Sequence, residues 1–275
     1  MGSRFAVCTL VGIVVAVAAC NASAVPSASL VAVSSSPSPT SSASAGVIDL
    51  DYNCNDNHPC TFAAGTYVLS DANAPDGTLL PGLGFTLNQA WSSREVWLGS
   101  VELDQVAGGG SMAILVDMVP ATQDGEPVPD VENQADAIAQ WILANPSLQT
   151  GEIALTTLGD GIRALGITVG VSPSWVNLDP DCPVESCSTV LTRRDWQCCF
   201  ALGLGDHARI YVANIGPSGR PHTLMVILGS IEDGPPMSMA GLAAFDASVR
   251  STLDSFVVPN ELVIYCGDTH PAHLC

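Results

Sequence analysis

The cysteine at position 20 has the clearest chemical context in the chain. It closes the sequence Val17-Ala18-Ala19-Cys20 at the end of the apolar run Phe5–Ala19, which begins just after Arg4. The run is shorter than the roughly 20 apolar residues of a membrane-spanning helix, and its layout is typical of an export signal. A thiol after small residues is where a diacylglyceryl thioether forms. We therefore predict a lipoprotein signal over residues 1–20 and a palmitate-type lipid anchor at Cys20.

Residues 21–45 have the composition of a tether. They contain ten serines, three prolines and no charged residue. Such a segment cannot bury enough apolar surface to fold, and as a flexible coil it would span about 25–30 Å. We expect it to hold a single domain, residues 46–275, on the extracytoplasmic side of the cell membrane.

The predicted domain contains eight cysteines. They are Cys54, Cys60, Cys182, Cys187, Cys198, Cys199, Cys266 and Cys275. An even number in an exported chain predicts disulfides, because the compartment outside the membrane is oxidising. Clustering favours bonds between the 182/187 pair and the 198/199 pair. For the others, the local loops Cys54–Cys60 and Cys266–Cys275 compete with two bridges between the ends of the domain, and we favour the local loops.

Two clusters offer zinc or copper ligands instead of disulfides. One consists of Cys266, Asp268, His270, His273 and Cys275, and the other of Cys54, His58 and Cys60. Disulfide formation would remove the sulfurs from both sets, so we expect no metal or cofactor. A metal-binding lipoprotein is the alternative prediction. The run Asp49-x-Asp51-x-Asn53 begins like a calcium loop, but Cys54 stands where the turn glycine belongs.

Catalytic motifs are scarce, and the sequence predicts a protein that is not an enzyme. There is no Gly-x-Ser-x-Gly elbow. The run Gly203-Leu204-Gly205-Asp206-His207-Ala208 matches a dinucleotide fingerprint in letters only, because a strand is predicted after it where a helix is required, so we expect a turn. Tryptophan can stack on sugar rings, and Trp175 and Trp196 flank the cysteine-rich region. A carbohydrate or polymer site at these two residues is a further alternative.

The charge of the chain is strongly negative. Twenty-seven acidic residues face eight basic ones, all arginine, for a formal net charge of −19. Eleven acidic residues lie between Arg94 and Arg163 with no basic residue among them. This balance excludes nucleic acid as a partner and would repel anionic lipid headgroups. The acidic surface therefore favours a role in solubility, with recognition of a basic partner as the alternative.

Period-two patterns predict strands along most of residues 46–275. The first group is Gly65–Ser70, Leu83–Leu87, Glu95–Asp104 and Met112–Val119. Two hairpins follow, Glu152–Thr157 with Ile162–Val171 around Asp160-Gly161, and His207–Ile215 with His222–Ile231. A short strand is expected at Glu261–Tyr265.

Two amphipathic helices are also predicted. The first runs from an N-cap at Asp130 to about Ala144, where Asn145-Pro146 ends it. The second runs over about Met239–Phe256, with Leu242, Phe245, Val249, Leu253 and Phe256 on one stripe. Antiparallel strands with two such helices predict an α+β fold: a central antiparallel sheet covered by the two helices, with a disulfide-rich loop insertion.

Three segments also carry a resemblance to a known family. They are Pro81-Gly82-Leu83-Gly84-Phe85-Thr86-Leu87 leading to Trp91, the helix end Ala144-Asn145-Pro146, and Phe245 followed by Leu253-Asp254-Ser255-Phe256. Over roughly Thr66–Val258 the chain resembles actinobacterial and chloroflexus-type exported lipoproteins with a PsbP-like fold, of the LpqN type. The resemblance implies a helix-covered sheet used for binding or scaffolding. The cysteine-rich insertion and the tail after Val258 depart from that pattern.

The sequence thus predicts a non-enzymatic, lipid-anchored module of the cell envelope. Its expected partners are the membrane, through Cys20, and an envelope protein or polymer.

Overall fold

The structure of the chain is a computed structural model. It describes Cys54 and residues 59–68, 82–97, 100–106, 109–122, 124–151, 153–159, 161–172, 187–193, 199–215, 222–231 and 234–258. The chain divides into two units, Met1–Ser42 and Ala43–Cys275, and every described residue belongs to the second. The predicted signal and the predicted tether lie outside the described residues.

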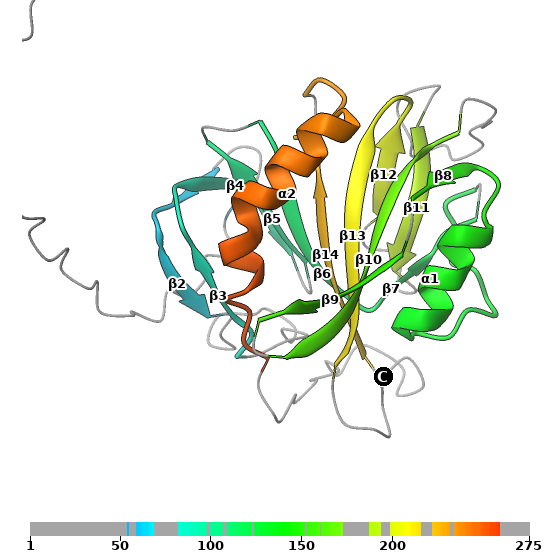
Figure 1. Cartoon of the computed structure of the whole chain (residues 1–275), viewed down its shortest axis with the longest axis horizontal. Coiled ribbons are helices and arrows are strands. Elements are labelled where there is room, and N and C mark those ends of the chain that lie inside the picture. Colours follow the sequence, from blue (N-terminus) through cyan, green and yellow to red (C-terminus); the bar gives the residue numbers. More distant parts are fainter. Residues whose placement is uncertain are drawn as a thin grey trace, which may run out of the picture. The chain divides into compact units, whose positions relative to one another are not determined.

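A nine-stranded antiparallel sheet forms the centre of the second unit (Figure 1). Across the sheet its strands are β1 (Cys60–Phe62), β4 (Trp91–Trp97), β5 (Ser100–Gln105), β6 (Ser111–Val116), β14 (His222–Gly229), β13 (His207–Ile215), β10 (Ile162–Val171) and β8 (Leu148–Thr150), with β9 (Ala154–Leu158) also paired to β10. Both predicted hairpins are confirmed, since β9 pairs with β10 and β13 pairs with β14.

Two smaller sheets accompany the large one. The first pairs β2 (Gly65–Val68) with β3 (Gly84–Leu87), and the second runs β12 (Cys199–Gly203), β11 (Cys187–Arg193), β7 (Met118–Pro120). Since β11 and β12 come from the cysteine-rich region, the predicted loop insertion is in part a β-hairpin.

The central strand β14 is apolar on both faces, which allows the sheet to be covered on both sides. Leu224, Val226 and Leu228 belong to one core cluster, whereas Met225 and Ile227 belong to a second. Successive side chains of a strand point to opposite faces, so the two clusters lie on opposite faces of the large sheet.

Helix α2 (Met239–Leu253) packs on the first face. Its predicted stripe is confirmed, because Leu242, Phe245, Val249 and Leu253 are all buried. The small β2–β3 sheet contributes Tyr67 and Phe85 to the same cluster. On the outer flank of the helix, Arg250 donates from Nη2 to the main-chain oxygen of Thr157 at 2.8 Å. This bond ties α2 to the strand β9.

Helix α1 (Ala135–Ala144) packs on the opposite face, beside β10, β13, β7 and β8 (Figure 1). Ala135, Ile138, Ala139 and Ile142 are buried, as their spacing predicts. The helix begins at Ala135, not after an N-cap at Asp130. Gln134 precedes it without a side-chain cap, and the side-chain oxygen of Asn214 on β13 accepts the Ala135 N–H at 2.7 Å.

The predicted fold class is wrong, because the chain is mostly β and two main helices do not cover the sheet. Strands account for 52% of the described residues, and the two helices of that part have 10 and 15 residues. With strands about 4.8 Å apart, the large sheet is about 35 Å wide, whereas a helix with its side chains is about 10 Å wide. One short helix per face leaves apolar sheet uncovered, and the two small sheets bury the remainder.

Two predicted strands are each divided in the structure. Glu95–Asp104 is the end of β4 and most of β5, which pair with each other. Met112–Val119 is interrupted at Asp117, whose φ of 56° makes it the one described non-glycine residue with a left-handed backbone. The chain leaves the large sheet at Asp117, because β7 pairs with β11 of the small sheet.

Candidate functional site

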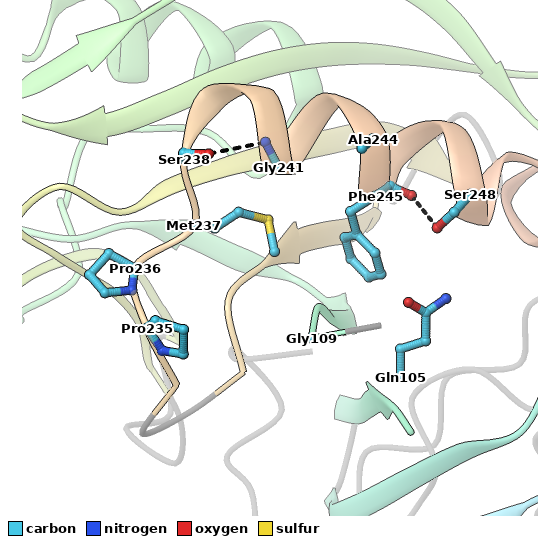
Figure 2. Close-up of a pocket in the computed structure, with 10 residues that line it drawn as sticks. All are labelled: Gln105, Gly109, Pro235, Pro236, Met237, Ser238, Gly241, Ala244, Phe245 and Ser248. Atoms are coloured by element: carbon cyan, nitrogen blue, oxygen red, sulfur yellow. Dashed lines mark hydrogen bonds between the residues drawn. The ribbon is translucent and has the colours of Figure 1, made fainter. Parts of the chain in front are cut away.

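A groove lies between α2 and the β5–β6 connection, and it has room for a ligand (Figure 2). Its volume is about 450 Å³. It is lined by Gln105, Gly109, Pro235, Pro236, Met237, Ser238, Gly241, Ala244, Phe245 and Ser248. These residues come from the end of β5, the segment before α2, and the first three turns of α2.

Three buried side chains form the floor of the groove: Gln105, Met237 and Phe245 are each less than 10% exposed. The Phe245 ring lies 6.3 Å from the ring of Trp91, which is fully buried. It also lies directly over Gly110, where an added Cβ would come within 2.6 Å of the ring. Phe245 therefore has a fixed position, and the floor is rigid and largely apolar.

The rim of the groove is exposed and carries neutral hydrogen-bonding groups. Pro235 and Pro236 form one wall. Ser238 is the N-cap of α2, and its Oγ accepts the Gly241 N–H at 3.1 Å. The Ser248 hydroxyl donates to the Phe245 main-chain oxygen at 2.8 Å. Gln105 points its amide toward this side of the helix (Figure 2).

None of the ten lining residues is charged. The described lining therefore contains no carboxylate that an apolar ligand would have to desolvate, in a chain with 27 acidic residues. Apolar walls with a few neutral polar groups are the usual composition of small-molecule sites.

Apart from the groove, a cluster of polar side chains surrounds Asp117. Its Oδ1 accepts from Asn133 Nδ2 at 2.7 Å and from the Thr223 N–H at 3.0 Å, and its Oδ2 lies 2.6 Å from His222 Nδ1. Thr223 Oγ1 in turn donates to Asn133 Oδ1 at 2.7 Å. The Asp–His pair has the form of a catalytic dyad, but no described nucleophile bonds to the histidine. The bonds join the start of β14 to the segment before α1, which is a structural task.

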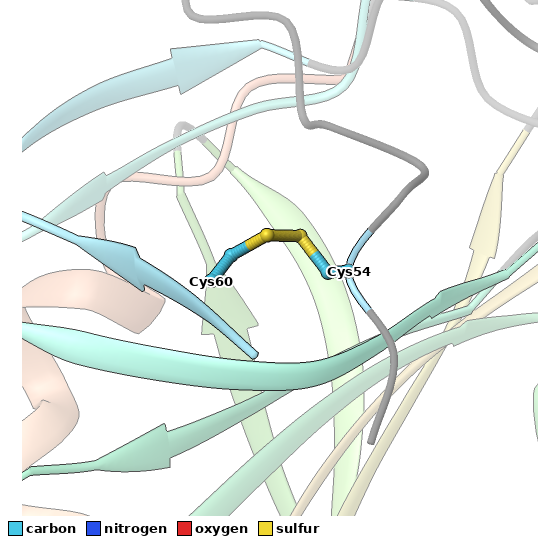
Figure 3. Close-up of a disulfide and its surroundings, with 2 residues drawn as sticks. All are labelled: Cys54 and Cys60. Atoms are coloured by element: carbon cyan, nitrogen blue, oxygen red, sulfur yellow. A yellow bond between two sulfur atoms is a disulfide. The ribbon is translucent and has the colours of Figure 1, made fainter. Parts of the chain in front are cut away.

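One predicted disulfide is confirmed. Cys54 and Cys60 are bonded, with Cα atoms 5.3 Å apart and a sequence separation of 6 (Figure 3). The bond fixes the chain before β1 to that edge strand. It also removes both sulfurs from the cluster proposed with His58 as a metal site.

The β11–β12 register excludes one pairing within the cysteine-rich region. Cys187 lies opposite Gly203, and Cys199 lies opposite Thr192. The two cysteines thus stand at opposite ends of the hairpin, five positions apart along β11 and four along β12, or about 13–16 Å. A disulfide requires Cα atoms closer than about 7 Å, so Cys187 and Cys199 do not bond to each other.

The remaining predicted site residues lie outside the described part of the chain. These are Cys20, Cys182, Cys198, Cys266 and Cys275, the tryptophans Trp175 and Trp196, and the histidines of the terminal cluster. Within the described residues, no group of three or more His, Cys, Asp or Glu side chains is arranged to hold a metal ion.

Sequence reasoning did not find the groove. Phe245 was expected only as a core residue, and the wall comes from a segment with no periodic pattern. The one local signal was Pro235-Pro236 before a serine N-cap, a rigid entry to a helix that leaves prolines on the surface.

Comparison with protein-family models and with curated proteins found no match to this chain. The resemblance to PsbP-like lipoproteins therefore stays a prediction. In the described residues, neither helix is long and apolar enough to cross a membrane.

Proposed function

We propose that this protein is a non-enzymatic, lipid-anchored binding module of the cell envelope, and that the groove beside α2 holds a neutral, partly apolar small molecule. The observation that carries the proposal is that none of the ten described lining residues is charged, in a chain of net charge −19. The export signal and Cys20 support the location, as argued from the sequence.

The dimensions of the groove support a small molecule. A volume of about 450 Å³ falls within the usual range of roughly 300–1,000 Å³ for ligand sites. Phe245 and Met237 supply apolar contact, whereas Gln105 and the two serines supply a few directional polar contacts. A ligand with an apolar body and a neutral hydrogen-bonding end would match this division.

Two neighbouring alanines of α2 provide the test. Ala244 lines the groove and Ala243 does not, and both are exposed. Ala244→Phe would fill the groove from an exposed position without disturbing the core, and Ala243→Phe is the matched control. The measurement uses the chain with Cys20→Ser, which has no acyl chain to compete, and follows the fluorescence of N-phenyl-1-naphthylamine, a neutral apolar probe.

We expect the parent and the Ala243→Phe chain to bind the probe, and Ala244→Phe to weaken binding at least tenfold. The sulfonated analogue 8-anilino-1-naphthalenesulfonate should bind more weakly than the neutral probe to the parent chain. Equal binding by the two phenylalanine variants, or no binding by the parent, would refute the groove as the ligand site.

A further inference from the structure

The wall of the groove belongs to the segment that connects β14 to α2. Its described residues are Ser230, Ile231 and 234–238. Within it, Gly234 donates its N–H to the Ile231 oxygen, and Pro235 and Pro236 have no N–H to donate. The segment therefore cannot be held by a strand ladder, and its position depends on a few specific bonds.

Those bonds converge on two consecutive residues, Asp206 and His207. Asp206 Oδ1 accepts the Met237 N–H at 2.6 Å, and Asp206 Oδ2 accepts the Ser230 hydroxyl at 2.9 Å. His207 donates its N–H to the Met237 oxygen at 3.1 Å, and its Nδ1 lies 3.1 Å from the same oxygen. A carbonyl only accepts, so the second contact requires the proton on Nδ1.

Asp206 is held in turn by the connection between β12 and β13. Its N–H donates to the Gly203 oxygen at 3.1 Å, and Gly205 has a φ of 86°, which glycine adopts without strain. These residues belong to the glycine-rich run of the sequence. The run forms the predicted turn, followed by strand β13 at His207.

The Asp206 carboxylate thus accepts hydrogen bonds from both ends of the segment between β14 and α2, from Ser230 and from Met237. Met237 is also a floor residue of the groove and is 8% exposed. Hydrogen bonds to an ionised acceptor are about twice as strong as neutral ones. Movement of Met237 away from its present position would break its N–H bond to Asp206 and its contacts with His207, while the Ser230 bond to Asp206 holds the other end of the segment.

We propose that Asp206 is the positioning residue of the groove: it holds the Pro235–Met237 wall at the separation from Phe245 that ligand binding requires. This inference rests on the proposed function and adds the residue that controls the site. Asp206 does not line the groove, so it acts through Met237 and not by contact with the ligand.

Three variants in the Cys20→Ser chain test the proposal. Asp206→Ala removes both acceptors. Asp206→Asn preserves both bonds, because its amide oxygen can accept from Met237 and its amide nitrogen can donate to the Ser230 oxygen. Asp246→Ala is the control, since it removes the partner of Tyr211 from α2, at 2.6 Å, without touching the wall.

We expect Asp206→Ala to weaken binding of N-phenyl-1-naphthylamine on the order of tenfold, while Asp206→Asn and Asp246→Ala bind within about twofold of the parent. Hydrogen exchange at the Met237 amide should accelerate on the order of tenfold in Asp206→Ala alone. Unchanged exchange at Met237, or equal loss of binding in Asp246→Ala, would overturn the assignment. Failure of the parent to bind the probe would refute the proposed function, whereas Met237 exchange would still decide whether Asp206 holds the wall.

Discussion

Asp117 has an uncommon backbone conformation, and its carboxylate accepts several hydrogen bonds. Its φ of 56° costs energy for most residues, although aspartate and asparagine tolerate it better than others. The carboxylate meets three donors from two other segments. The hydrogen bonds offset the backbone cost, and together they fix the point where the chain passes from the large sheet to the small one.

Removal of the Asp117 carboxylate should therefore destabilise the fold. We expect Asp117→Ala to lower the free energy of unfolding by about 3 kcal/mol, because Asn133, His222 and the Thr223 N–H each lose an acceptor. Asp117→Asn should cost less, since asparagine suits the backbone and keeps one acceptor. Urea unfolding measures both. Asp124→Ala, at an exposed turn with no described bond, is the control. It should change the free energy of unfolding by less than about 0.5 kcal/mol. A loss of stability in Asp124→Ala equal to that in Asp117→Ala would contradict the assignment.

At the scale of elements, Tyr211 and Asp246 link β13 to α2. The Tyr211 hydroxyl donates to Asp246 Oδ1 at 2.6 Å, and Arg209 Nε lies 3.7 Å from Asp246 Oδ2. Burial raises the pKa of Tyr211 well above its ordinary value of 10.0, and the bond to Asp246 raises it further. The neutral phenol is thus the form that the folded chain stabilises.

This raised pKa predicts a loss of stability at alkaline pH. The contribution is fully present below pH 10.0, the ordinary pKa, and is lost as pH rises toward the higher folded value. We expect the free energy of unfolding to fall with pH above about 10, and Tyr211→Phe to reduce that slope. Chemical unfolding between pH 8 and 11 measures it. Burial also raises the pKa of Tyr67, so Tyr67 should contribute part of the pH dependence. Tyr67→Phe therefore serves as the comparison. An unchanged slope in Tyr211→Phe would contradict the link.

The sequence predicted elements well where the pattern is local. The bounds Ile162–Val171 and His207–Ile215 agree with β10 and β13, since both segments carry β-branched or aromatic residues that fit the pleated, half-buried surface of a sheet. The start of α1 was missed because its capping group is Asn214, 79 residues away in sequence. The division of Met112–Val119 was missed because Asp117 is stabilised by Asn133 and His222 from elsewhere.

The groove was beyond sequence reasoning for the same physical reason. Its floor contains Phe245, whose burial the helical spacing predicted. Its wall is positioned by Asp206, which belongs to a turn before a different strand, and nothing local to Pro235 or Met237 indicates that contact. Residues that act through distant partners carry no periodic signal.

At the scale of the whole molecule, the strong negative charge of the chain contrasts with the uncharged described lining of the candidate site. The chain has a formal net charge of −19, while the described residues that line the groove are neutral. A strongly acidic exterior resists association with anionic headgroups. Under the proposed anchor at Cys20, this repulsion would keep the proposed ligand site available beside the membrane.

The proposed anchor has a direct test. Cells expressing the full chain would be labelled with an alkynyl palmitate analogue, followed by fractionation. We expect the parent to carry the label and to sediment with membranes, and Cys20→Ser to lose the label, because the thiol is the only attachment point for the thioether. Cys8→Ser, within the predicted signal, should behave as the parent. A labelled Cys20→Ser chain, or an unlabelled parent, would contradict the anchor.

The bond from Arg250 to Thr157 has a consequence for a protein confined to a surface. A lipid anchor would hold many copies in two dimensions, where exposed strand edges meet often and can pair into lateral aggregates. The guanidinium of Arg250 donates to the Thr157 carbonyl of β9, and at the far edge of the sheet β1 is three residues long and begins at a disulfide. Each contact takes up part of a sheet edge, so under the proposed anchor we expect less edge-to-edge pairing than two long free edges would allow.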